Sequence, residues 1–99
     1  MQFSSRVHFV VVERSYLMEL ANITTLCMKE NRTNLAVVEA CISFLYSLAF
    51  SNVPAVSNAL LRGTIVKTYV QEFLLYPFPN DALYLASMLQ EIALRIGPP

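Results

Sequence analysis

Glycine, cysteine, histidine and charged residues are scarce in this chain of 99 residues, and tryptophan is absent. Its two glycines, Gly63 and Gly97, cannot form the glycine-rich loops that bind nucleotide phosphates. Cys27 and Cys41 have no CxxC spacing and no histidine at ligand spacing, so the sequence predicts no zinc site, and it indicates no other cofactor. We expect both cysteines to be buried free thiols in a reducing compartment.

The low charge excludes further classes of function. Charged residues make up 14% of the chain, against about 25% in typical soluble domains. Because Lys and Arg form no cluster, binding to nucleic acid through a basic surface is not expected. The acidic residues occur singly, so the sequence indicates no catalytic pair of carboxylates, and we expect a protein that is not an enzyme.

The sequence does not favour a membrane segment. The first residues make a poor signal peptide, because the apolar run over residues 7–12 is short and is interrupted by His8. We therefore expect an intracellular protein of the cytoplasm or nucleus. Residues 40–61 carry no charge, but Asn52 and Pro54 would break a helix in the middle of that stretch. A small membrane-associated protein that uses residues 35–61 is an alternative.

Helical patterns cover most of the chain. Helices are predicted over residues 15–30, 35–50, 54–61, 64–76 and 81–96. Asn34, Thr64 and Asn80 are candidate N-caps, and Pro54 suits the first turn of a helix. Gly63 is predicted to end a helix in the left-handed conformation.

Residues 1–14 fit either of two structures. The run VHFVVV is rich in β-branched residues and is typical of an edge strand. No second strand is predicted that could pair with it, so a short or frayed helix is favoured. The fold class predicted for the single domain, residues 1–99, is therefore all-α.

The predicted helices repeat along the sequence. When the chain is moved by 44 residues, CISFLYSLAF (41–50) aligns with LASMLQEIAL (85–94). A movement of 46 residues aligns the preceding helices. The matched apolar pairs include Leu45 with Leu89, Ala49 with Ala93, and Met28 with Leu74. Leu45 and Leu89 are central in their helices, and we expect both to be core residues. Such a period lies within the range of about 40–47 residues that is typical of armadillo and HEAT repeats.

Residues 52–96 resemble one armadillo repeat, with a short first helix, a glycine at Gly63, a second helix, a proline-containing corner and a long third helix. The resemblance implies a short right-handed α-solenoid of about two repeats, over residues 1–51 and 52–97. Residues 1–14 would be a degenerate first helix, with Arg14-Ser15 where the glycine should stand. An orthogonal five-helix bundle is the alternative fold.

The resemblance implies a non-catalytic scaffold that binds a protein partner on the groove of third helices. It places Ser43 and Ser47 in one repeat, and Ser87 and Glu91 in the next, at groove positions where peptide-binding members carry Trp and Asn. Neither residue type stands there, so we do not expect recognition of an extended basic peptide. A helical partner is expected instead, because an apolar helix face can lie in a shallow groove of small residues. Glu39 and Tyr46 would lie near its rim.

The last predicted helix also indicates self-association. Its apolar residues lie on more than one helix face: Leu83, Leu85, Met88, Leu89, Ile92 and Leu94. A terminal repeat normally has a polar outer face, and about three repeats are usually needed for stability. The sequence thus predicts an exposed apolar patch, covered by a second molecule or by additional repeats of a longer parent, of which this chain would be a fragment or short isoform. An autonomous helical bundle that dimerises is the alternative.

Overall fold

The computed structural model describes the backbone of residues 2–97 and the side chains of residues 16–60 and 62–97. Over this range the chain has five α-helices, one short 3₁₀ helix and no strand. The helices are α1 (Gln2–Glu30), α2 (Leu35–Ala49), α3 (Pro54–Leu61), α4 (Thr64–Phe73), η1 (Asn80–Ala82) and α5 (Leu83–Ile96). The predicted all-α fold class is confirmed.

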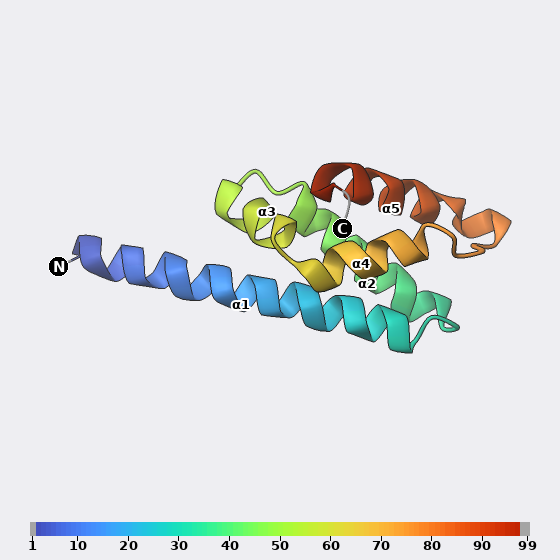
Figure 1. The fold of residues 1–99 in the computed structure, drawn as a ribbon, viewed down its shortest axis with the longest axis horizontal. Helices are drawn as coiled ribbons and strands as arrows, with labels where there is room; N and C mark the ends of the chain where they lie inside the picture. The colour runs from blue at the N-terminus through green and yellow to red at the C-terminus, as the bar shows by residue number, and fades with distance from the viewer. Residues whose placement is uncertain (1, 98–99) are drawn as a thin grey trace.

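The largest departure from the prediction is the length of α1. This helix runs without interruption for 29 residues, so the predicted boundary at Arg14-Ser15 is wrong, and residues 2–14 form neither a strand nor a separate helix. No proline or glycine precedes Pro54, and β-branched residues lower helix propensity only slightly. The N-terminal half of α1 extends beyond the other helices and gives the molecule its elongated shape of 54 × 22 × 22 Å (Figure 1).

Several predicted helix ends are confirmed. The Asn34 side chain caps α2 by accepting a hydrogen bond from the Val37 amide at 3.4 Å. Pro54 occupies the first position of α3, where its missing N–H costs nothing. The chain leaves α5 at Gly97, whose φ of +78° lies in the region that favours glycine. The two prolines that follow lie outside the described residues.

Other predicted ends are corrected. Gly63 is extended, with φ −79° and ψ 107°, so it does not adopt the left-handed conformation, and it rather than Thr64 is the N-cap of α4. A glycine fits here because the turn between α3 and α4 is crowded. A Cβ at this position would lie 3.3 Å from a methyl group of Val66. Asn80 does not cap α5 either, because residues 80–82 form the 3₁₀ turn η1 and α5 begins at Leu83.

The helices form two parallel pairs. α4 packs beside α1 and α5 packs beside α2, each pair running in one direction, while α3 packs against α1 and α2 (Figure 1). At one end of the second pair, the Tyr84 hydroxyl donates to the Glu39 carboxylate, 45 residues away. At the other end, Arg95 Nε donates to the Ala49 carbonyl, 46 residues away, at 3.1 Å. These two bonds fix α2 and α5 as parallel neighbours.

The core lies between the two pairs of helices. Leu45 and Leu89, which were predicted to be core residues, both have 0% exposed surface. In α5 the side chains of Leu83 and Leu94 are 52% and 77% exposed. The prediction that apolar residues of the last helix lie on more than one face is therefore confirmed for these two leucines.

One cysteine is placed differently from the prediction. Cys41 is buried on α2, whereas Cys27 is exposed on α1, and both are free. The side of α1 that packs on the core carries Ala21, Thr25 and Met28, all at most 1% exposed. Cys27 lies to one side of this stripe and is therefore exposed to solvent.

None of the described helices is both long and apolar enough to cross a membrane. Residues 35–61 do not form one helix, because α2 ends at Ala49 and α3 begins at Pro54.

Candidate partner-binding surface

The residues predicted to bind a partner lie on two neighbouring helices. Ser43 and Ser47 lie on α2, Ser87 and Glu91 lie on α5, and all of these side chains are exposed. We call the exposed side of these helices the α2–α5 surface, comprising Glu39, Ser43, Ser47, Tyr84, Ser87 and Glu91. Because α2 and α5 pack side by side, the two predicted sets share one part of the molecular surface.

The local structure explains why this surface carries short side chains. Successive turns of α2 bury Leu45 and Leu48 on one side, so Ser43 and Ser47, at intermediate positions of the helix, face solvent. The Ser47 hydroxyl donates to the Phe44 carbonyl of its own helix at 2.7 Å. Its hydrogen-bonding needs are therefore met within α2, and another backbone can approach closely.

Larger side chains close the surface at both ends. At one end the predicted rim residue Glu39 accepts the hydrogen bond from Tyr84, a residue that was not predicted to lie at this site. At the other end the Arg95 guanidinium lies 5.5 Å from the centre of the Phe50 ring. The predicted rim residue Tyr46 is half-buried and packs on Phe50, with ring centres 4.6 Å apart.

Two shallow hollows follow α5 along this surface. Ser87 and Glu91 line one of about 390 Å³ together with Ala86 and Gln90. Glu91 also lines the second, of about 310 Å³, with Phe50, Leu94 and Arg95. The Glu91 carboxylate thus lies between the hollow beside Ser87 and the more apolar hollow beside Phe50 and Leu94.

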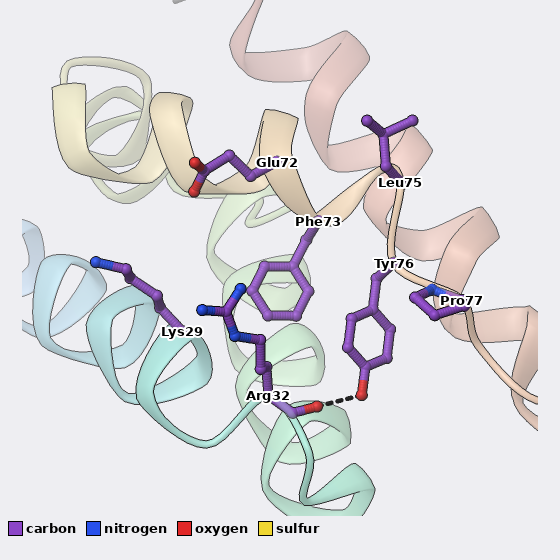
Figure 2. Close-up of a pocket in the computed structure, with 7 residues that line it drawn as sticks. All are labelled: Lys29, Arg32, Glu72, Phe73, Leu75, Tyr76 and Pro77. Carbon is purple, nitrogen blue, oxygen red and sulfur yellow. Dashed lines mark hydrogen bonds between the residues drawn. The ribbon is translucent and has the colours of Figure 1, made fainter.

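A third hollow, of about 330 Å³, was not predicted from the sequence. It lies where the end of α1 meets the end of α4, and Figure 2 shows its side chains around one opening. Its lining residues are Lys29, Arg32, Glu72, Phe73, Leu75, Tyr76 and Pro77. They come from segments about 40 residues apart, so no local spacing could have grouped them.

Tyrosines hold this third hollow in shape. The Tyr76 hydroxyl donates to the Arg32 carbonyl, and its ring stacks on Phe73 with centres 5.2 Å apart (Figure 2). Lys29 Nζ lies 3.2 Å from the Tyr69 hydroxyl, and this hydrogen bond raises the pKa of the Lys29 ammonium group. Tyr76 is half-buried and joins the segment after α4 to the loop between α1 and α2.

The charged and nucleophilic groups of the described residues are distributed rather than gathered. Within residues 16–97, no group of three or more His, Cys, Asp and Glu side chains is placed to hold a metal ion. The α2–α5 surface carries four hydroxyls and two carboxylates, and the Arg95 guanidinium lies at one end of it. Comparison with protein-family models, curated proteins and solved structures finds no match.

Proposed function

We propose that this chain is a non-catalytic protein-interaction module, about two repeats of a right-handed armadillo-like solenoid, which binds a helix of a protein partner on the α2–α5 surface. One observation carries the proposal: α2 and α5 are parallel neighbours joined by two hydrogen bonds. The partners of one bond are 45 positions apart in the sequence, and those of the other are 46 positions apart. This spacing agrees with the sequence period, and it is what stacking of one repeat on the preceding one requires.

The shape of the α2–α5 surface supports a helical partner. Two parallel helices leave a shallow groove between them. The axes of packed helices lie about 8–10 Å apart, and a third helix can rest in a groove of that width. Ser43, Ser47 and Ser87 are exposed and small, so a partner helix can approach without displacing a large side chain. Its apolar residues would contact the end of the surface near Phe50 and Leu94.

The charges on the surface indicate the composition of that helix. Glu39 and Glu91 are acidic, whereas Arg95 is directed to the Phe50 ring and the Ala49 carbonyl. A partner helix with Lys or Arg about one turn from its apolar residues would pair with Glu91 at the rim. Such rim pairs add specificity and association rate more than affinity.

The proposal is tested by selection from a displayed library of amphipathic helical peptides, with a library of unstructured peptides in parallel. We expect binders from the helical library that carry a basic residue. Ser43→Arg combined with Ser87→Arg should abolish their binding, because the two long cationic side chains would fill the groove.

A matched control uses two exposed polar positions on other helices. Asn58→Arg with Thr68→Arg adds the same charge to α3 and α4 and should leave both binding and helicity unchanged. Binders drawn only from the unstructured library, or helical binders equally insensitive to both double variants, would contradict the proposal.

A further inference from the structure

The molecule contains one interface between its own repeats, and the receiving side of this interface is formed by α1 and α2. Lys29 of α1 contacts Tyr69 of α4, with Nζ 4.7 Å from the ring centre, and Ala49 of α2 accepts the bond from Arg95 of α5. Beneath these contacts, Met28 and Ala49 are 0% and 1% exposed. The second repeat, α4 and α5, therefore covers the receiving side formed by α1 and α2.

The same receiving side recurs one repeat later, where it is open. A groove of about 350 Å³, here called the end groove, lies between α4 and α5 and is lined by Gln71, Leu74, Gln90, Ala93, Leu94 and Gly97. The shifts of 46 and 44 residues that align the repeats place Met28 on Leu74, Ala49 on Ala93 and Phe50 on Leu94. Met28 is 0% exposed, whereas its counterpart Leu74 is half-buried, and Leu94 is 77% exposed where its counterpart Phe50 is 39% exposed. The end groove is therefore less covered than the equivalent surface of α1 and α2.

The opposite side of the stack is also open. Tyr69 of α4, which contacts α1 through Lys29, corresponds to Ile23 of α1 under the shift of 46 residues. Ile23 is 55% exposed, and Tyr16, two turns earlier on the same helix, is 61% exposed. We call this exposed side of α1 the start face, comprising Tyr16, Ile23 and the half-buried Leu20 between them.

We infer that the end groove of one molecule binds the start face of a second copy of this chain, in a head-to-tail contact. The occupant is identified by the interface that already exists: α4 seats Tyr69 against α1, and the start face presents Ile23 at the equivalent position. The two sides of the contact are different surfaces, so the contact is heterologous, and its repetition produces open chains rather than a closed two-fold dimer. This inference rests on the repeat arrangement of the proposed function.

Two exposed positions separate the two sides of the contact. Leu94→Arg blocks the end groove, Ile23→Arg blocks the start face, and both residues are more than half exposed, so we expect folding to be retained. Sedimentation velocity of the wild-type chain should show a concentration-dependent series of oligomers. Each variant alone should remain monomeric at the concentrations at which the wild type associates.

The decisive sample is the mixture of the two variants. The Ile23→Arg chain keeps its end groove and the Leu94→Arg chain keeps its start face, so an equimolar mixture should form a 1:1 dimer and nothing larger. Val53→Arg, at an apolar residue that is 55% exposed between α2 and α3, is the control and should associate like the wild type. Circular dichroism checks that all three variants keep the helicity of the wild type.

A wild-type chain that is monomeric at every concentration, a variant mixture that stays monomeric, or single variants that associate normally would each overturn the inference. Ser43 and Ser87 lie outside both the end groove and the start face. Leu94 lines both the end groove and the apolar end of the α2–α5 surface, so helix binding is measured on the wild type and on the Ile23→Arg chain. A wild-type chain that binds the helix but does not associate refutes this inference alone, and one that associates but binds no helix refutes only the proposed helix-binding function.

Discussion

Truncation of Leu45 tests how much stability the packing of α2 supplies. Leu45 lies at the centre of α2, has 0% exposed surface and belongs to the buried cluster that also contains Leu89 and Ile42. Leu45→Ala removes three carbon atoms from this cluster while it keeps a good helix former in the helix. The expected loss of stability therefore comes from packing and not from helix propensity.

The magnitude has two parts. Withdrawal of three buried carbon atoms costs roughly 2.4 kcal/mol at about 0.8 kcal/mol for each methylene. A residual cavity of about 60 Å³ would add ~1.4 kcal/mol at about 24 cal/mol per Å³. The sum, about 4 kcal/mol, is a large fraction of the free energy of unfolding of a folded domain, which is ~5–15 kcal/mol.

The assay is urea unfolding followed by circular dichroism at 222 nm, at a protein concentration where the chain is monomeric. Leu94→Ala is the matched control, because it removes the same three carbon atoms from a residue that is 77% exposed. It should change the free energy of unfolding by no more than about 0.5 kcal/mol. With a slope of about 1–3 kcal/mol per molar urea, Leu45→Ala should lower the midpoint by more than 1 M. Equal effects of the two substitutions would refute the assignment of Leu45 to the core.

Three further substitutions or treatments have defined outcomes. Asn34→Ala should destabilise the chain by about 1 kcal/mol through loss of the α2 cap, and an unchanged unfolding curve would contradict the cap. Gly63→Val should cost about 1–3 kcal/mol and more than Gly63→Ala, because a Cβ already lies 3.3 Å from Val66; equal unfolding midpoints would contradict crowding. Burial, and secondarily the neighbouring Cys27, raises the pKa of the Cys41 thiol to about 11. At pH 8 iodoacetamide should therefore modify Cys27 much faster than Cys41, and stability should fall as pH rises from 9 towards 11; equal alkylation rates, measured by peptide mass, would contradict this.

Local signals in the sequence were sufficient for most of the helices. Asn34 followed by an apolar stripe predicted a helix over 35–50, and α2 spans Leu35–Ala49. Pro54 marked the start of α3 for a steric reason that needs no tertiary context. The apolar stripes also identified Leu45 and Leu89 as core, since a helix face with that spacing can only be buried on one side.

The features that were missed depend on tertiary contacts. The conformation of Gly63 follows from the crowded corner beside Val66 and not from a helix-end rule. Cys27 is exposed because the core-facing stripe of α1 passes through Met28 instead. The hollow between Lys29 and Tyr76 combines residues whose proximity follows only from the packing of α4 beside α1.

The candidate surface was predicted in part. The repeat shifts placed Ser43, Ser47, Ser87 and Glu91 at equivalent positions, and these four residues are exposed on adjacent helices. The ties of Tyr84 to Glu39 and of Arg95 to Ala49 were not predicted. A period in the sequence indicates which positions correspond, but the side-chain hydrogen bonds between α2 and α5 depend on the separation and angle of the packed helices.

The parallel stacking of α2 and α5 is the central claim, and a pair of spin-label distances tests it most directly. Labels would be attached to cysteines introduced at three exposed positions, Ala40 in α2 with either Leu83 or Leu94 in α5, after replacement of Cys27 and Cys41. Leu94 lies roughly 15 Å further along α5 than the level of Ala40, since a helix rises about 1.5 Å per residue. With helix axes about 10 Å apart, the parallel arrangement predicts that the 40–94 distance exceeds the 40–83 distance by about 8 Å. Equal distances, or a shorter 40–94 distance, would contradict the stacked arrangement on which the proposed function depends.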